Sequence, residues 1–203
     1  FVQIAESKGL IEKLGNVAFE KVCKFISENR NLVQAVSINF SVYQMMNPNL
    51  VQNVLGTIGR FGLQPSNIIM EITESIFIDN FDLVRKNMIQ LAVAGIKFYL
   101  DDFGTGYSSL SYLKRLQFDI IKIDQCFVSD VTESAYNYRL ISTMQELANF
   151  SNILICLEGV ETEKQLRLLS DLRPDVYQGY LFSRPVEANV FTASFIDNGA
   201  DAY

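Results

Sequence analysis

The 203-residue sequence contains no histidine, and this absence removes whole classes of active site. Catalytic triads in which histidine is the base are excluded, and so are the histidine-ligated zinc sites. Cysteine is scarce as well. Cys23, Cys126 and Cys156 are odd in number and far apart, so they indicate neither a disulfide framework nor a C-x-x-C metal site. Such cysteine usage is typical of a reducing cytoplasm, where we expect the protein to work.

The sequence also lacks a long hydrophobic run and an excess of positive charge. No stretch of about 18 apolar residues is present, so no membrane span is predicted. Residues 1–15 do not have the pattern of a signal peptide. The net charge of −6 argues against binding to long nucleic acids. Hydrophobic residues make up 49% of the chain, which indicates one globular domain over residues 1–203.

Helical patterns alternate along the chain with short apolar runs. A helix is predicted over residues 80–95, with Gly95 at its C-terminal end. A second helix opens at Thr162, which forms a capping-box pattern with Gln165. The first 30 residues also have a helical pattern, which we expect to be interrupted around Gly9 and Gly15.

The apolar runs predict six strands. Because helical patterns separate them, they predict βα units around a parallel sheet, as in a (β/α) barrel. A closed eight-stranded barrel usually needs about 250 residues, so we expect an α/β TIM-type barrel that lacks its first strand or strands. An open doubly wound sheet is the alternative. The predicted strands span residues 35–41, 67–74, 96–102, 118–124, 153–160 and 176–182.

Each predicted strand carries a polar residue at or just past its C-terminal end. In a (β/α) barrel this end of the sheet builds the active site, so we expect these side chains to converge in one mouth. Any one of them alone is equally compatible with a structural role, such as a turn or an ordinary ion pair. The residues are Asn39, Glu71, Asp101, Asp102, Lys122, Glu158 and Gln178.

The stretch KFYLDDFGTGYSSL, residues 97–110, places two carboxylates side by side. Neighbouring side chains of a strand point to opposite faces, so Asp101 and Asp102 can share one site only where the strand ends. Oxygen ligands without histidine or thiolate favour Mg²⁺, Ca²⁺ or Mn²⁺. Two such ions about 3.5–4 Å apart form the arrangement that hydrolyses phosphate esters. A solvated aspartate pair in a structural turn is the alternative.

Six segments, in this order and spacing, resemble the EAL-domain family, the cyclic di-GMP phosphodiesterases of bacterial signalling. The resemblance implies a modified TIM barrel, two Mg²⁺ or Mn²⁺ ions, and hydrolysis of cyclic di-GMP to linear pGpG in the bacterial cytoplasm. It also implies a homodimer formed through residues 103–109 and fusion to sensor or GGDEF domains. The segments are SINFS, MEITES, LDDFGTGYSSL, IKIDQCFV, LEGVET and QGYLFSRP.

The resemblance further implies which residues bind the metal ions. Asn39, Glu71 and Asp101 match ligands of the first ion, and Asp101 would bridge to the second. Asp102 lies alongside, and Glu158 joins the metal ligands as the proposed general base.

Three more residues match positions with roles in the family. Lys122 matches the lysine that holds the attacking water, Gln178 a glutamine near the substrate, and Glu74 the glutamate that anchors the 103–109 loop. The Glu-Ala-Leu motif itself, which supplies a further metal ligand, is not found, and we expect the chain to begin after that strand. A weak or inactive domain that binds cyclic di-GMP as a regulatory module is therefore the alternative to an active phosphodiesterase.

Overall fold

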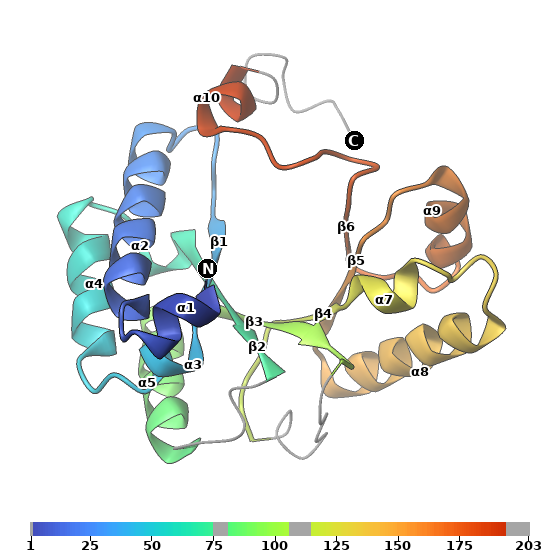
Figure 1. Cartoon of the computed structure of the whole chain (residues 1–203), viewed down its shortest axis with the longest axis horizontal. Helices are drawn as coiled ribbons and strands as arrows, with labels where there is room; N and C mark the ends of the chain where they lie inside the picture. Colours follow the sequence, from blue (N-terminus) through green and yellow to red (C-terminus); the bar gives the residue numbers. More distant parts are fainter. Residues whose placement is uncertain (1, 75–80, 106–114, 194–203) are drawn as a thin grey trace.

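A computed structural model describes residues 2–74, 81–105 and 115–193, and within them the predicted sheet is present (Figure 1). Six parallel strands pair in the order β1-β2-β3-β4-β5-β6. Each strand therefore pairs with the next strand along the chain, and the sheet has no switch point, which excludes the doubly wound alternative. The strands are β1 Val36–Asn39, β2 Ile68–Thr73, β3 Lys97–Phe103, β4 Ile120–Ile123, β5 Leu154–Glu158 and β6 Val176–Gln178.

Helices connect the strands and cover the outer face of the sheet (Figure 1). The N-terminal side carries α1 Val2–Ser7, α2 Ile11–Glu28, α3 Val42–Met45, α4 Leu50–Arg60 and the 3-10 turn Pro65–Asn67. The helix α5, Phe81–Ala94, joins β2 to β3. The C-terminal side carries α7 Gln125–Val128, α8 Ala135–Ser151, α9 Glu163–Ser170 and α10 Ala188–Phe191.

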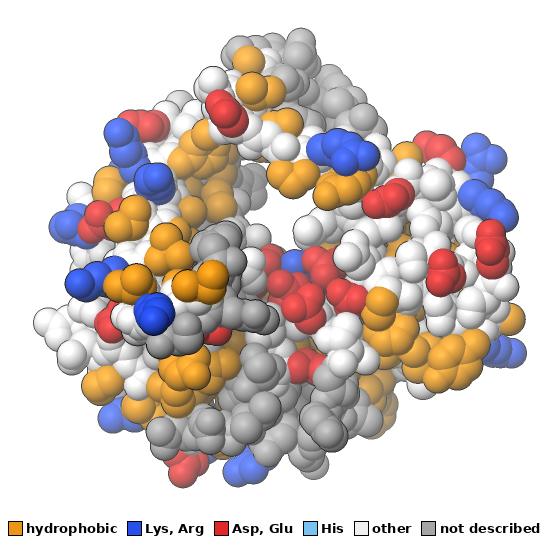
Figure 2. All heavy atoms as spheres, in the orientation of Figure 1, with side chains coloured by type: hydrophobic (Ala, Val, Ile, Leu, Met, Phe, Trp, Pro, Cys, Tyr) orange, Lys and Arg blue, Asp and Glu red, His pale blue; other side chains and the backbone are white. Residues whose placement is uncertain are grey.

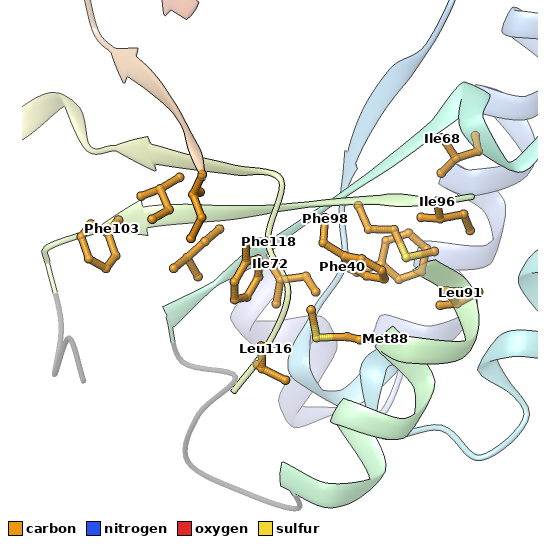
Figure 3. Close-up of a cluster of buried hydrophobic side chains, with 14 of the residues drawn as sticks. Phe40, Ile68, Ile72, Met88, Leu91, Ile96, Phe98, Phe103, Leu116 and Phe118 are labelled. Atoms are coloured by element: carbon orange, nitrogen blue, oxygen red, sulfur yellow. The ribbon is translucent and has the colours of Figure 1, made fainter. Parts of the chain in front are cut away.

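The two faces of the sheet differ in chemistry because side chains alternate along each strand. Met70, Phe98, Leu100 and Ile155 point outward into the core and are almost completely buried. Figure 3 shows part of this core, where Met88 and Leu91 of α5 pack against Phe98 and Ile72 of the sheet. The residues between these apolar positions face inward, and they include the polar residues of the predicted site.

The sheet is an incomplete barrel within the described residues. β1 and β6 are its two outer strands, and neither has a second partner strand in the part of the chain that the structure describes. Figure 1 shows the strands arranged around an open centre, and the connection from β6 to α10 runs along its upper border. The expected fold class, an α/β TIM-type barrel short of its full set of strands, is confirmed. Within the described residues no helix is long and apolar enough to span a bilayer.

The predicted helix boundaries are mostly confirmed. Gly9 has φ 65° between α1 and α2, and Gly95 has φ 110° directly after α5. Thr162 and Gln165 form the predicted capping box of α9. The predicted interruption at Gly15 is wrong, because Gly15 lies inside α2. A Cβ atom there would lie 2.0 Å from the Gln44 amide nitrogen, so this glycine permits close packing of α2 on α3.

Candidate active site

Lys122 lies at the centre of the predicted site, enclosed by three carboxylates from three different strands. Its Nζ atom is 2.7 Å from Oε1 of Glu158, 2.9 Å from Oδ1 of Asp101 and 3.1 Å from Oε2 of Glu71. The lysine is only 4% exposed. An ammonium group has three protons to donate, so these carboxylates together match its donor capacity.

A bulge in β3 brings both aspartates to this lysine. Leu100 pairs with Ile121 and Phe103 pairs with Ile123, so two residues of β3, Asp101 and Asp102, lie opposite the single residue Lys122 of β4. Such a two-against-one pairing defines a β-bulge. Asp102 takes the left-handed conformation, with φ 55°, which aspartate tolerates better than most residues.

The bulge corrects the prediction that the two aspartates share a site because the strand ends there. Both lie inside β3, which continues to Phe103, and the extra residue re-aims the second side chain. The chain turns afterwards at Gly104, which has φ 98° and whose added Cβ would lie 2.7 Å from the Phe127 ring. Residue 106, the second predicted glycine of this turn, lies outside the described residues.

Three carboxylates of the site are suitably placed to hold a cation. One oxygen from each of Asp101, Asp102 and Glu158 lies within 4.8 Å of the other two. Together with Glu71 they set four carboxylates against the one ammonium group of Lys122, an excess of three negative charges if all are ionised. Such crowded negative charge is costly unless a cation compensates it. An all-oxygen donor set of this kind fits Mg²⁺, Mn²⁺ or Ca²⁺.

The protonation states within the site follow from burial and from this crowding. Burial by itself would lower the pKa of Lys122, but the hydrogen bond to Glu158 and the charges of Glu71 and Asp101 raise it well above the ordinary value. The lysine is therefore charged. Burial raises the pKa of Glu158, against the opposing effect of Lys122. The pKa of Asp102 is also raised, by burial and then by the charges of Asp101 and Asp124.

Cys156 lies beside the site without the properties of a nucleophile. It pairs in register with Lys122 and is 3% exposed. Burial raises its pKa to about 12, against the opposing effect of Lys122, so the thiol stays protonated near neutral pH. Nucleophilic attack by a cysteine requires the thiolate, and Cys156 therefore belongs to the wall of the site.

Two predicted site residues flank the lysine cluster. Asn39 pairs in register with Glu71, and Gln178 pairs with Glu158. Both are exposed and lie on the two outer strands of the sheet. The sheet therefore places all the predicted strand residues on one inner face, with a cluster of five at the centre, Glu71, Asp101, Asp102, Lys122 and Glu158.

Glu74 follows β2 and is 8% exposed. Part of the loop that it is predicted to anchor, residues 106–109, lies outside the described residues, so that contact stays a prediction.

The sequence analysis did not single out one acidic residue beside this five-residue cluster. Asp124 directly follows β4, and its charge raises the pKa of Asp102, which places the two carboxylates near each other. Its Oδ1 atom also accepts a hydrogen bond from the Cys126 backbone at 2.9 Å. The signal was present in the sequence, because Asp124 ends its apolar run as the other site residues end theirs.

Figure 2 shows the site from its open side. Acidic side chains gather around one basic group, beside the hollow at the centre of the molecule. Elsewhere on this face acidic and basic side chains are interspersed. The negative potential of this face is therefore concentrated at the inner face of the sheet.

Comparison with known proteins identifies the domain family that the six sequence segments resemble. The family model of the EAL domain matches residues 1–185. The chain is 34% identical over 197 residues to the bifunctional diguanylate cyclase/cyclic di-GMP phosphodiesterase MucR of Pseudomonas aeruginosa, covering 96% of the chain and 29% of that protein. It is 32% identical to the signaling protein YkoW of Bacillus subtilis, covering 97% of the chain and 25% of that protein. The chain thus spans less than a third of the length of these curated relatives.

Solved structures agree with the fold. The MucR phosphodiesterase in complex with c-di-GMP superposes with a TM-score of 0.88 at 34% identity, covering 94% of this chain and 78% of that one. Klebsiella pneumoniae BlrP1 superposes with a TM-score of 0.79 at 30% identity, covering 86% of this chain and 45% of that one, and its solved complexes with c-di-GMP include one with calcium and one with manganese.

Proposed function

The chain belongs to the EAL domain family, and on that premise we propose that its inner-face site hydrolyses one phosphodiester bond of cyclic di-GMP to give linear pGpG. The observation that carries the proposal is the Lys122 cluster, in which a buried, charged lysine meets carboxylates from three strands. The same site holds three oxygens placed for a divalent cation.

Asn39, Glu71 and Asp101 are the proposed ligands of one Mg²⁺ or Mn²⁺ ion. Asp101 would be shared with a second ion, for which Asp102 and Glu158 are the other proposed ligands. Such ions would supply positive charge for the substrate phosphates and lower the pKa of a bound water. Their charge also explains how a protein of net charge −6 accepts an anionic dinucleotide.

Glu158 is proposed as the base that removes a proton from the attacking water. Its Oε1 atom is held by Lys122 at 2.7 Å, which leaves Oε2 to accept that proton. Burial raises its pKa above the ordinary carboxyl value, against the opposing effect of Lys122, which makes it a stronger base than a solvated glutamate.

Lys122 is proposed to act as a hydrogen-bond donor throughout the reaction. Because its pKa is raised, it cannot serve as a base near neutral pH, but it can orient Glu158, Asp101 and the water beside them. Glu74 is proposed to position the 103–109 loop next to the two aspartates, and Gln178 to contact the substrate from β6.

The test is formation of pGpG from cyclic di-GMP in Mn²⁺ or Mg²⁺, followed by chromatography. We expect wild-type chain to form pGpG and the Glu158→Gln variant to bind cyclic di-GMP without turnover. The matched control is Glu163→Gln on α9, an exposed carboxylate that should leave turnover unchanged.

Binding without hydrolysis in the wild-type chain would contradict catalysis and support the regulatory binding module instead. A wild-type chain that shows no binding of cyclic di-GMP and no hydrolysis would contradict both functions. Full turnover in Glu158→Gln would contradict the role of Glu158 as the base, but it would not affect the assignment of cyclic di-GMP as the substrate.

A further inference from the structure

The short helix α7 lies next to two turns of the candidate site. It follows β4, and Figure 1 shows it between α8 and α9, beside β5. Its N-terminal cap is Asp124, which comes two residues after Lys122 and accepts a hydrogen bond from the Cys126 N–H at 2.9 Å. The strand that carries the lysine therefore also fixes where α7 begins.

Two glycines allow α7 to pack closely against these turns. Gly159 directly follows Glu158, and a Cβ atom there would lie 3.1 Å from Cα of Gln125 and closer still to its Cβ. Gly104 lies in the turn after the β3 bulge, where an added Cβ would lie 3.0 Å from Cζ of Phe127. Consequently α7 packs between the turn after β3 and the turn after β5, the two strands that carry the three-carboxylate group.

The side chain of Gln165 joins the end of α7 to the chain after β5. Its Oε1 atom accepts hydrogen bonds from the backbone N–H groups of Glu161 and Thr162, both at 2.9 Å. Its Nε2 atom donates to the backbone carbonyls of Val128 and Ser129, both at 3.2 Å. The last carbonyls of a helix have no partner inside the helix, so this amide supplies donors that α7 needs.

Gln165 uses both ends of its amide, and this distinguishes it from an ordinary capping residue. The capping box of α9 needs only the acceptor oxygen, which a glutamate would supply equally well. The Nε2 donor serves α7 instead. Gln165 is 6% exposed and its bond to the Val128 carbonyl is buried, so loss of the donor would leave that carbonyl unsatisfied.

We propose that Gln165 is a positioning residue for the metal-binding carboxylates. It locks α7 to the chain after Glu158, and α7 in turn sets the distance between that chain and the turn after Asp102. The inference rests on the proposed function for the role of Asp102 and Glu158 as metal ligands. One oxygen of each lies within 4.8 Å of the other, so a small shift of either turn changes the geometry offered to a cation.

The test measures Mn²⁺ affinity and the paramagnetic resonance spectrum of bound Mn²⁺ for wild-type chain and Gln165→Glu. The variant keeps the acceptor oxygen of the capping box but replaces the donor with an oxygen that faces two carbonyls. We expect Mn²⁺ binding to weaken by about 10-fold, the lower end of the range for groups that orient metal ligands, with an altered spectrum. In the metal-free protein we expect faster hydrogen exchange over residues 158–162.

The matched control is Asn87→Asp on α5. Asn87 is 2% exposed, and its Nδ2 atom donates to the backbone carbonyls of Met45 and Asn47 at 2.9 and 3.0 Å. The substitution therefore makes the same change of a buried amide donor to a carboxylate, at a link between α5 and the end of α3. It should lower the melting temperature as Gln165→Glu does, yet leave Mn²⁺ affinity and exchange over residues 158–162 at wild-type values.

Phe127→Leu is a second variant, which shortens the side chain that packs against Gly104 and leaves Gln165 in place. It should weaken Mn²⁺ binding by less than Gln165→Glu does, and it provides the test if Gln165→Glu does not fold.

Wild-type Mn²⁺ affinity in folded Gln165→Glu, or an equal loss in Asn87→Asp, would overturn the inference. If Gln165→Glu does not fold, wild-type affinity in Phe127→Leu would overturn it. A wild-type chain that binds no Mn²⁺ would instead contradict the proposed metal site, and the exchange rates of the metal-free proteins would still decide whether Gln165 fixes the chain after Glu158.

Discussion

The Nζ atom of Lys122 lies 2.9 Å from Oδ1 of Asp101, across the one place where the pairing of β3 and β4 is irregular. The irregularity gives the lysine two consecutive aspartates as neighbours. In a regular strand one of the pair would point into the apolar core, where an isolated carboxylate is very unfavourable. The bulge therefore allows the sheet to carry both charges on its inner face.

Removal of this lysine should destabilise the protein. Lys122→Met leaves Glu71, Asp101 and Glu158 close together without their shared cation. Loss of one partner from a buried ion pair typically costs about 3–5 kcal/mol of unfolding free energy, and we expect a loss of this order without metal ions. Urea denaturation followed by circular dichroism measures it. Lys164→Met, an exposed lysine on α9, is the control, and equal unfolding free energies for the two variants would contradict the prediction.

Asp102→Asn should stabilise the metal-free protein. The pKa of Asp102 is raised on folding, by burial and then by Asp101 and Asp124, so its ionised form is disfavoured in the native state. Asparagine also tolerates the left-handed backbone at this position. We expect a higher melting temperature than wild type near neutral pH in EDTA.

The pH dependence of this difference has a defined sign. A carboxyl group with a raised native pKa takes up protons more readily when folded, so wild-type stability falls as pH rises from the ordinary aspartate value, about 3.9, to the raised one. Below that window both proteins carry a neutral group and should melt alike, whereas above it the variant should be more stable. A constant difference across the range would show that the gain does not come from this ionisation.

Divalent cations should stabilise the folded chain. A cation that binds only the native state raises stability by mass action, by about 2.7 kcal/mol at 100 times its dissociation constant. We expect millimolar Mn²⁺ to raise the melting temperature and EDTA to reverse the shift. Asp101→Asn should remove most of the shift, because Asp101 belongs to the three-carboxylate group. Asp130→Asn is an exposed control, and an equal shift in both variants would contradict Asp101 as a ligand.

The outer edge of β1, which has no partner strand among the described residues, should promote self-association. Exposed strand edges offer free backbone donors and acceptors to another chain. Phe40 donates its N–H to Glu71 of β2, so by alternation Ser37 directs its own N–H toward the free edge. Ser37→Pro therefore removes an edge donor without loss of a bond to β2.

We expect concentration-dependent oligomers of the wild-type chain by size-exclusion chromatography with light scattering, and fewer oligomers for Ser37→Pro. The control is Ser129→Pro, which instead removes a hydrogen bond that the Ser129 N–H donates to Gln125 at 2.8 Å, and which should destabilise the fold without relieving edge pairing. A wild-type chain that stays monomeric at all concentrations would contradict the prediction.

The strands and most helix ends were predictable from the sequence because they depend on local chemistry. Apolar runs such as residues 118–124 favour buried strands, Gly95 permits a left-handed helix end, and Thr162 with Gln165 satisfies the backbone donors at a helix start. The polar residues next to the ends of those runs were equally visible. In a parallel sheet the carboxyl ends of the strands lie on the same side, so the convergence of these polar residues followed from the strand prediction.

Tertiary structure alone decided how those residues meet. The β3 bulge is a property of the pairing with β4, and no local pattern in Asp101 and Asp102 distinguishes a strand that ends from one that bulges. The role of Gly15 also required the tertiary structure. Its sequence context suggests a helix break, but it lies inside α2, where the lack of a side chain leaves room for Gln44. The sequence by itself determined the fold class and the chemical character of the site, because both follow from periodicity and residue type. The geometry around Lys122 required the structure, since it depends on contacts between residues as far apart in the chain as Glu71 and Glu158, which only the packed sheet brings together.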